Sequence, residues 1–586
     1  MSSGEENAPL VTKDGSRKYV YVLTCFATIG GLLFGYDTGI VSGSMLLIRD
    51  DFQLSTIWQE IIVSATIGAA ALFSLVAGSL VDRFGRKKVI MSASVIFTIG
   101  AVVMAMSPTD KKEILLAGRL IVGAGIGFAS MSVPIYVAEA APADIRGALV
   151  TVFQLFITIG ILVSSLIAGA FSSDKVNGWR YMLGLAGVPG VIQFIGFLFL
   201  PETPRWLVKM KKHDQARECL IKIRGTSNID KELNDIQQAV REEEMQQRHS
   251  GLKIFVMMLT SQPVRKALIL GCLLMVFQQL CGINTVIYYS ASILRMSGFP
   301  SELAIWLACI PNAVNMVCTF IGVYTVEKLG RRSLTLISFL GIIIALVILG
   351  TGFYLADHNS PPISNMSHFG GNSNCYDYRW CSDCTLDDHC GFCWENKNED
   401  TTGACLPVYS EHPERYAVPP VNSSDTYRCN QTDYEGPKTY RWANDYCPTS
   451  YGWMSVLGLA LFVFSFAPGL GPNPWTINSE IYPLWARGTA ISIATAVNWL
   501  ANLLVSLTFL TLLETITRYG TFYLFAGISS VGFVVIFCIL PETKNKTLEE
   551  VTDIFMTEQF RRLHTQIPEG TTSIKGDNNA YQQSST

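Results

Sequence analysis

Charged residues are scarce in this chain of 586 residues. Asp, Glu, Lys and Arg make up 16% of the sequence and hydrophobic residues 49%, whereas a soluble domain carries about 25% charge. The apolar residues gather in long runs, which excludes a soluble multidomain protein, a disordered chain and a coiled coil. The net charge of −3 is too small to attract nucleic acid. The composition therefore predicts a protein that crosses the lipid bilayer many times.

Motifs for catalysis are also missing. The sequence has no phosphate-binding P-loop, no nucleophile elbow and no set of metal ligands inside an apolar run. Residues 1–18 are polar and lack the apolar stretch of a cleavable signal peptide, so we expect the first span to direct insertion. We predict neither an enzyme nor a bound cofactor or metal ion.

Twelve apolar runs are long enough to cross the bilayer, because about 20 helical residues span its roughly 30 Å of hydrocarbon. Long continuous runs exclude the short alternating strands of a β-barrel, so the spans must be helices. The predicted spans are residues 19–42, 57–81, 88–106, 113–136, 148–171, 180–200, 265–290, 303–325, 333–356, 451–476, 488–512 and 521–540. The fold class is therefore an all-α membrane protein.

Lys and Arg residues are concentrated in the loops that follow spans two, six and eight. The positive-inside rule makes these loops cytoplasmic, together with the N-terminus at 1–18, the helical linker at 201–264 and the tail at 541–586. The segment 357–450, after span nine, then faces the outside. Its composition was not used to fix this orientation, and it suits an oxidising exterior.

The segment 357–450 contains three glycosylation sequons and eight cysteines, an even set that favours disulfides outside the cell. The sequons are at Asn365, Asn422 and Asn430, and the cysteines are Cys375, Cys381, Cys384, Cys390, Cys393, Cys405, Cys429 and Cys447. The two C-x-x-C pairs could instead hold zinc, but the extracellular setting favours disulfides. The sequence leaves their pairing open, since eight cysteines allow 105 connectivities.

Several motifs occur twice along the chain, which indicates two related halves of six spans each. Span two is followed by RFGR, ending at Arg86, and span eight by KLGR, ending at Arg331. Glu139 and Arg146 correspond in the same way to Glu480 and Arg487. The separation along the sequence between a motif and its repeat is larger for the motifs that follow the segment 357–450. This segment is therefore an insertion between 265–356 and 451–540 in the second half. We expect these repeated charges to form ion pairs between helices that hold the cytoplasmic gate shut, although they could be simple positive-inside charges.

Two charged residues, Asp37 and Arg119, lie inside predicted spans, where ionisable groups are costly and usually functional. At 1.5 Å per helical residue, Asp37 lies about 7 Å and Arg119 about 9 Å below the outer face, so the two could pair. The arginine favours an ionised carboxylate and burial disfavours it. Such an acid could load a proton outside and release it inside. A permanent ion pair that only joins two helices is the alternative.

Amide side chains occur in the middle of several spans, where an unpartnered amide is expensive. They are Gln154, Gln278, Gln279, Asn284, Asn315, Asn498 and Asn502. Amides both donate and accept hydrogen bonds, which suits an uncharged ligand rich in hydroxyls. Each amide alone better fits a bond between helices. The whole set, spread over both halves without lysine or carboxylate, favours a polyol pocket. We expect Pro472-Asn-Pro-Trp475 to break span ten beside that pocket.

The motifs together resemble those of the sugar-porter branch of the major facilitator superfamily. The matching motifs are GRKK and GRR in the loops, PETPRWL at 201–207, QQLCGIN at 278–284, GPNPW at 471–475 and PETK at 541–544. The similarity covers residues 19–555 apart from the insertion. The aspartate in GYDTG and the plexin-like cysteine motif of the insertion resemble the proton-coupled inositol carriers of this branch, whereas facilitative glucose carriers have asparagine at the GYDTG position.

The resemblance implies a role for each matching residue. Proton coupling falls on Asp37 and Arg119, and substrate binding falls on Gln154, Gln278, Gln279, Asn284, Asn315, Trp475 and Asn498. It implies symport of myo-inositol with a proton, by alternating access, across the plasma membrane, with an additional pool in intracellular vesicles left open. One alternative is an uncoupled carrier of hexoses or polyols. Another is a receptor or adhesion protein whose insertion binds an extracellular partner.

Overall fold

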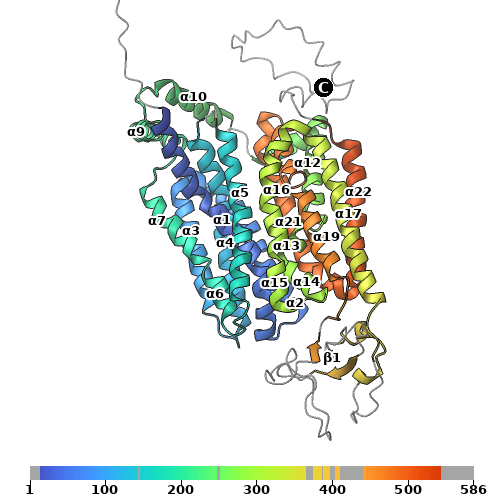
Figure 1. Cartoon of the computed structure of the whole chain (residues 1–586). Helices are drawn as coiled ribbons and strands as arrows, with labels where there is room; N and C mark the ends of the chain where they lie inside the picture. The colour runs from blue at the N-terminus through green and yellow to red at the C-terminus, as the bar shows by residue number, and fades with distance from the viewer. Residues whose placement is uncertain are drawn as a thin grey trace, which may run out of the picture.

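The computed structural model describes residues 13–142, 145–246, 251–363, 374–385, 387, 389–395, 403–408, 440–444 and 446–542. Two helical bundles stand side by side, one from the first half of the chain and one from the second (Figure 1). Helices α9 and α10 lie at one end of the molecule and strand β1 of the insertion at the other (Figure 1). The predicted cytoplasmic and extracellular segments are thus at opposite ends.

Six spans form the first half. They are α1 Lys13–Phe52, α2 Thr56–Phe84, α3 Arg86–Ala105, α4 Lys112–Ala140, α5 Arg146–Phe171, and a sixth span made of α6 Gly178–Gly184 and α7 Gly187–Phe199. The first helix is longer at both ends than the predicted span 19–42. Four short helices follow in the linker that was predicted to be cytoplasmic: α8 Pro204–Lys209, α9 His213–Arg224, α10 Asp230–Gln246 and α11 Gly251–Thr260.

The second half contains more interrupted spans. They are α12 Gln262–Leu280 with α13 Ile283–Tyr288 and α14 Ser290–Met296, then α15 Ser301–Leu307 with α16 Cys309–Leu329, then α17 Arg331–His358, α19 Gly452–Phe466 with α20 Asn473–Glu480, α21 Leu484–Thr515 and α22 Arg518–Ile539. Within the described ranges, eleven helices are long and apolar enough to cross a membrane, and Gly452–Phe466 is a shorter apolar helix. Eleven predicted spans are confirmed, and the tenth is the short one.

Span seven is broken, although the sequence suggested one continuous apolar helix. The chain leaves α12 at Cys281, and Gly282 then has a φ of +92°, a conformation that glycine adopts without strain. The expected break in span ten also occurs, but it begins earlier than Pro472. Helix α19 ends at Phe466, and six residues including Pro468 and Gly469 separate it from α20. Proline and glycine end the helix there because neither supports a helix interior.

Helix α1 is held in place by direct packing of its backbone against α5. A Cβ atom added to Gly35 would lie 1.9 Å from the carbonyl oxygen of Ile157, and one added to Gly31 would lie 2.7 Å from that of Phe153. Only glycine permits so close an approach, as in other membrane helices that pack through small residues. This packing fixes the depth and rotation of α1, and therefore of Asp37.

The insertion is a small antiparallel sheet joined by disulfides. Its strands are β1 Cys390–Glu395, β2 Gly403–Pro407 and β3 Tyr440–Ala443, in the order β2-β1-β3. The 3₁₀ helix η1 Asn374–Asp377 and helix α18 Cys381–Cys384 precede them. Its bonds are Cys375–Cys390, Cys381–Cys447 and Cys384–Cys405, and Cys393 is also disulfide-bonded. The prediction of disulfides is confirmed for these seven cysteines. The zinc alternative is wrong, because Cys381 and Cys384 bond to different partners.

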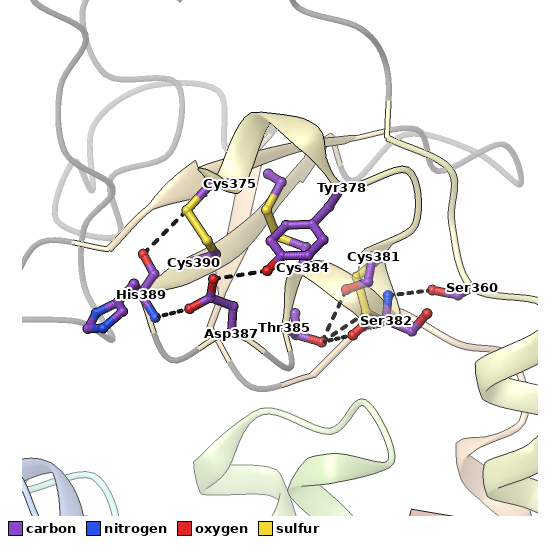
Figure 2. Close-up of a disulfide and its surroundings, with 12 residues drawn as sticks. Ser360, Cys375, Tyr378, Cys381, Ser382, Cys384, Thr385, Asp387, His389 and Cys390 are labelled. Atoms are coloured by element: carbon purple, nitrogen blue, oxygen red, sulfur yellow. Dashed lines mark hydrogen bonds between the residues drawn. A yellow bond between two sulfur atoms is a disulfide. The ribbon is translucent and has the colours of Figure 1, made fainter. Parts of the chain in front are cut away.

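Cys429 and the sequon residues Asn365, Asn422 and Asn430 lie outside the described residues, so those predictions stay open. Figure 2 shows how side chains support the disulfides around α18. The Tyr378 hydroxyl donates to Asp387 at 3.0 Å, and the main-chain N–H of Ser382 donates to Ser360 at 2.8 Å. Ser360 follows α17 directly, so this last bond links the insertion to the end of a membrane span.

We expect Cys447→Ser to destabilise the insertion. The Cys381–Cys447 bond closes a loop with a sequence separation of 66, and a loop of that length constrains the unfolded chain by about 4 kcal/mol. Limited proteolysis of intact cells should cut the variant's insertion faster than that of the wild type. Equal cutting rates under non-reducing conditions would show that this bond does not stabilise the domain.

Candidate functional site

Asp37 and Arg119 form a buried ion pair in the first half. The Arg119 Nη1 atom lies 2.6 Å from Asp37 Oδ1, and each residue is 3% exposed. Arg119 also donates through Nε to the carbonyl of Ile62 at 3.2 Å, and Thr66 donates to the carbonyl of Arg119 at 3.2 Å. The pair thus connects α1, α2 and α4. The structure brings together the two residues whose depths matched, and their role in coupling stays a prediction.

A small pocket adjoins the ion pair and is closed by aromatic residues of the second half. Asp37, Thr38 and Arg119 line it, together with Tyr288 and Trp499 from across the interface. The Tyr288 hydroxyl interacts with the side chains of Thr38 and Asn502. A residue of broken span seven therefore contacts the neighbour of Asp37. This contact could not be predicted from the sequence, because it depends on how the two halves meet.

Four of the predicted amides form one continuous network. Asn284 donates to Gln279 Oε1, Gln279 donates to Asn498 Oδ1 at 3.1 Å, and Asn498 donates to Gln278 Oε1 at 2.7 Å. Gln278 in turn donates to the carbonyls of Leu470 and Gly471 at 3.0 and 2.7 Å. Those carbonyls lie in the break between α19 and α20. The network thus links the breaks of spans seven and ten through α21.

The other predicted binding residues lie outside this network. Asn315 on α16 is 7% exposed, whereas Trp475 on α20 is 43% exposed and Gln154 on α5 is exposed as well. An amide and an indole exposed in mid-span can face water when a cavity between the halves is open. None of the three is joined to the four-amide network by a described side-chain hydrogen bond.

The two halves are joined by polar contacts at the end of the molecule where the insertion lies. Ser42 on α1 lies 2.9 Å from the hydroxyl of Ser290, and Asn312 on α16 donates to Ser165 on α5 at 2.6 Å. Ser173 donates to Glu302 at 2.8 Å nearer the outer surface. The two halves are therefore joined at the end that was predicted to face outside.

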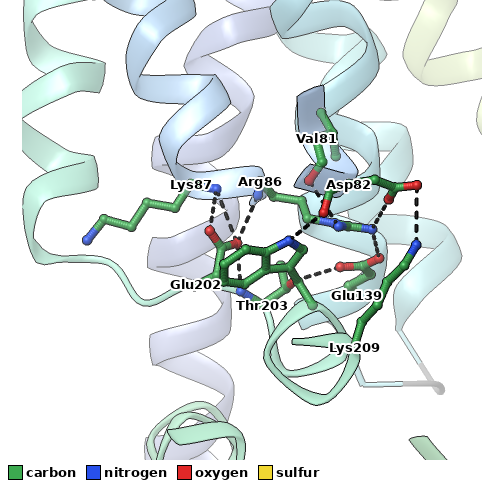
Figure 3. Close-up of polar contacts among 9 residues, drawn as sticks. Val81, Asp82, Arg86, Lys87, Glu139, Glu202, Thr203 and Lys209 are labelled. Carbon is green, nitrogen blue, oxygen red and sulfur yellow. Dashed lines mark hydrogen bonds and ion pairs between the residues drawn. The ribbon is translucent and has the colours of Figure 1, made fainter. Parts of the chain in front are cut away.

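The ion pairs of the first half at the predicted cytoplasmic end stay within that half. Arg86 at the start of α3 lies 2.9 Å from Glu139 on α4 and 3.5 Å from Asp82 on α2 (Figure 3). Thr203 donates to the second carboxylate oxygen of Glu139 at 2.6 Å. These bonds join α2, α3, α4 and the segment that precedes α8. These residues form ion pairs between helices, as predicted, but within one half, and their role in a gate stays a prediction.

Glu202 occupies the N-terminus of α3, where helix N–H groups have no partner of their own. Its carboxylate accepts from the N–H groups of Arg86 at 3.0 Å and Lys87 at 3.1 Å (Figure 3). Burial raises the pKa of Glu202, and the N–H donors act in the opposite direction. Glu202 therefore serves as a cap for α3 supplied from a distant segment.

The second half repeats this arrangement. Arg331 lies 3.1 Å from Glu480, and Glu542 accepts from the N–H groups of Arg331 and Arg332 at 3.0 and 3.1 Å. Arg487 does not join an ion pair with these residues but donates to the carbonyl of Tyr482. Arg146 is exposed, and no other residue in the described part of the chain forms an ion pair with it. The repeated motifs hold each half together separately in this state.

We expect Gly85→Ala to disrupt the cap of α3. Gly85 has φ +95° and ψ 160°, and an added Cβ would lie 2.3 Å from Glu202 Oε2. That backbone region is nearly exclusive to glycine and costs other residues about 1–3 kcal/mol. The variant should melt at a lower temperature in detergent. Gly78→Ala is the matched control, since its Cβ would meet nothing within 4 Å. Equal melting temperatures for the two variants would refute the role given to Glu202.

The chain matches the family model described as "Sugar (and other) transporter" over residues 23–371 and 438–555. It is 48% identical over 548 residues to the human proton myo-inositol cotransporter, covering 93% of this chain and 83% of that protein. It is 37% identical to inositol transporter 4 of Arabidopsis thaliana, covering 91% of each. The structure is similar to the inward open conformation of the E. coli xylose transporter XylE, with a TM-score of 0.64, 25% identity, and coverage of 92% of this chain and 100% of that one. The protein therefore belongs to the sugar transporter family of the major facilitator superfamily.

Proposed function

We propose that this protein is a symporter that carries myo-inositol together with a proton by alternating access. The observation that carries the proposal is the ion pair of Asp37 and Arg119, buried beside a pocket that both halves line. A proton carrier must be reachable from each side in turn, and this pair lies where the halves meet. The relatives named as myo-inositol and inositol transporters support the choice of substrate.

The proton step depends on two opposing effects on the ionised form of Asp37. Arg119 stabilises the carboxylate, and the loss of water on burial destabilises it. When the outer side is open, water reaches the pair and Asp37 takes a proton, which weakens its bond to Arg119. Release of that proton to the cytoplasm restores the pair. The membrane potential assists the inward step by about 2.3 kcal/mol per 100 mV for each charge moved.

The substrate step uses the amide network of the second half. The network offers both donors and acceptors, and all four of its side chains are uncharged amides: Gln278, Gln279, Asn284 and Asn498. Inositol hydroxyls can exchange with these amide-to-amide bonds, because a hydroxyl also donates and accepts. We assign Gln154, Asn315 and Trp475 to the remaining wall of the site. Tyr288 lines the pocket beside Asp37 and interacts with Asn502 on the same helix as Asn498.

The mature protein is placed in the plasma membrane with both termini in the cytoplasm, and a vesicle pool is compatible with the same topology. No resident cofactor takes part, since the proton is a co-transported substrate. The described residues of the insertion give no support for a protein partner, so none is included in the proposal.

Uptake of labelled myo-inositol and labelled glucose over a range of external pH tests the function. We expect myo-inositol uptake to rise as the exterior becomes more acid, and we expect little competition from glucose. Uptake of myo-inositol that does not change with pH would instead favour an uncoupled carrier. Preference for glucose would overturn the assignment of the substrate.

A further inference from the structure

Glu60 is a buried carboxylate that the transport steps above do not use. It lies in the second turn of α2, near the extracellular end of the first half, and is 3% exposed. Its two oxygens are bound by Thr511 of the other half, and the main-chain N–H of Leu510 beside it interacts with the same carboxylate. Oε1 accepts from the main-chain N–H of Thr511 at 2.8 Å, and Oε2 accepts from the Thr511 hydroxyl at 2.7 Å.

The Thr511 N–H is an unusual partner, because it lies inside helix α21. A main-chain N–H within a helix ordinarily donates to the carbonyl four residues earlier. Here it is directed toward a carboxylate that comes from another helix. The side chain of Thr511 adds a second donor at the same position. The main-chain N–H and the hydroxyl of Thr511 thus bind one carboxylate from across the interface between the halves.

The same two helices make another contact nearby, in which Thr56 of α2 donates to Glu514 of α21. The negative charge of Glu514 opposes that of Glu60. The buried Glu60 therefore depends on the donors of Thr511 and Leu510 in the other half, since a buried carboxylate is costly unless its oxygens are bonded. When the halves separate on the outside, these bonds must break and water must replace them.

The other polar contacts at this end of the interface each involve fewer bonds to a carboxylate. Ser42 with Ser290 and Ser165 with Asn312 are bonds between neutral groups. The ion pair of Arg295 with Asp50 has a separation of 3.8 Å. Glu302 and Glu514 each accept one described hydroxyl bond, from Ser173 and Thr56. Hydrogen bonds to an ionised group are about twice as strong as neutral ones, and Glu60 accepts two of them from Thr511.

We propose that Glu60 and Thr511 form a latch that holds the extracellular gate shut, and that this latch breaks and re-forms once in each transport cycle. Glu60 is a positioning residue in this account, because it touches neither substrate nor Asp37. The latch is present only when the outer ends are together, so its strength sets the balance between inward- and outward-facing states. A ligand or bond that favours one state shifts the balance by its differential free energy.

The test is cysteine accessibility from outside. Ile305 on α15 is 1% exposed and packs against α1 at Gly43, between the halves. A cysteine introduced by Ile305→Cys should react slowly with a membrane-impermeant maleimide on intact cells. Adding Glu60→Gln should speed that labelling about tenfold, the shift produced by about 1.4 kcal/mol. The chain without Ile305→Cys gives the background from native cysteines.

Thr511→Val is the second variant, and it covers the case in which Glu60→Gln does not reach the cell surface. It removes one donor and keeps the carboxylate, so labelling should rise by a smaller factor. The double variant should label no faster than Glu60→Gln alone, because both substitutions act on one contact. Glu113→Gln, at an exposed carboxylate at the extracellular start of α4, is the matched control and should label like the parent.

Transport kinetics separate a latch from a merely structural role. Weakening the latch populates the outward-facing state, so the KM for external substrate should fall while surface expression is unchanged. A structural defect would lower expression and leave both KM and labelling per surface molecule unaltered. Wild-type labelling rates in both surface-expressed variants would overturn the proposal. The proposal rests on alternating access, but the labelling needs neither substrate nor proton gradient, so it can fail independently of the assigned function.

Discussion

Replacing Asp37 with asparagine is expected to abolish the accumulation of myo-inositol against its gradient. Asparagine keeps the size of the side chain and can still accept from Arg119, but it cannot take up a proton. One pH unit of gradient is worth 1.36 kcal/mol, or about tenfold in accumulation per proton, and this contribution should disappear. Asp37→Asn should therefore let labelled myo-inositol approach equal concentrations on both sides, at every external pH.

The control for this prediction is Asp110→Asn, at an exposed carboxylate in the loop between α3 and α4. It should accumulate myo-inositol as the wild type does. Exchange of labelled for unlabelled myo-inositol supplies a second check, because Asp37→Asn should retain exchange if it folds. Full concentrative uptake by Asp37→Asn would show that the ion pair is only a structural link between helices.

Gln279→Ala should raise the KM for myo-inositol by about 10- to 100-fold, the effect of losing hydrogen bonds worth about 1–3 kcal/mol. Gln279 is the central member of the amide network, since it accepts from Asn284 and donates to Asn498. Its removal takes the acceptor from Asn284 and the donor from Asn498 Oδ1, and it takes away one contact for a hydroxyl. The KM is best measured from initial uptake rates at saturating proton concentration.

Gln193→Ala is the matched control for a span amide that only links helices. Gln193 on α7 is fully buried, donates to the carbonyl of Ala27 at 3.0 Å and accepts from Ser94 at 2.9 Å. Its loss should lower thermal stability and leave the KM near the wild-type value. If Gln279→Ala behaves in the same way, the amide network is a packing feature and the substrate site lies elsewhere.

Much of the fold follows from hydropathy and from the internal repeat. Long apolar runs locate the helices, and the greater spacing of partner motifs locates the insertion. The break in span ten was predicted from its prolines, although the helix ends earlier than expected, at Phe466. The break in span seven was not predicted, because Gly282 changes the backbone locally while hydropathy stays high. Disulfide pairing could not be predicted either, because it depends on how the strands of the insertion stack.

For the candidate site, too, some contacts could be predicted from the sequence and others could not. Asp37 and Arg119 could be matched by depth, because both lie in helices of known direction within one half. Glu60 and Thr511 could not, since their contact depends on the conformation that the two halves adopt. The repeated cytoplasmic charges show a related limit. The sequence indicated that Glu139 and Arg86 were structurally equivalent to Glu480 and Arg331, but only the structure shows that each pair stays within its own half.

The most direct test of the account is the simultaneous measurement of proton and myo-inositol flux in proteoliposomes that contain the purified protein. With no pH gradient at the start, adding external myo-inositol should drive protons inward and acidify the lumen, and the Asp37→Asn variant should show no acidification. Entry of myo-inositol into wild-type vesicles without any change in luminal pH would contradict the proposal of proton-coupled symport.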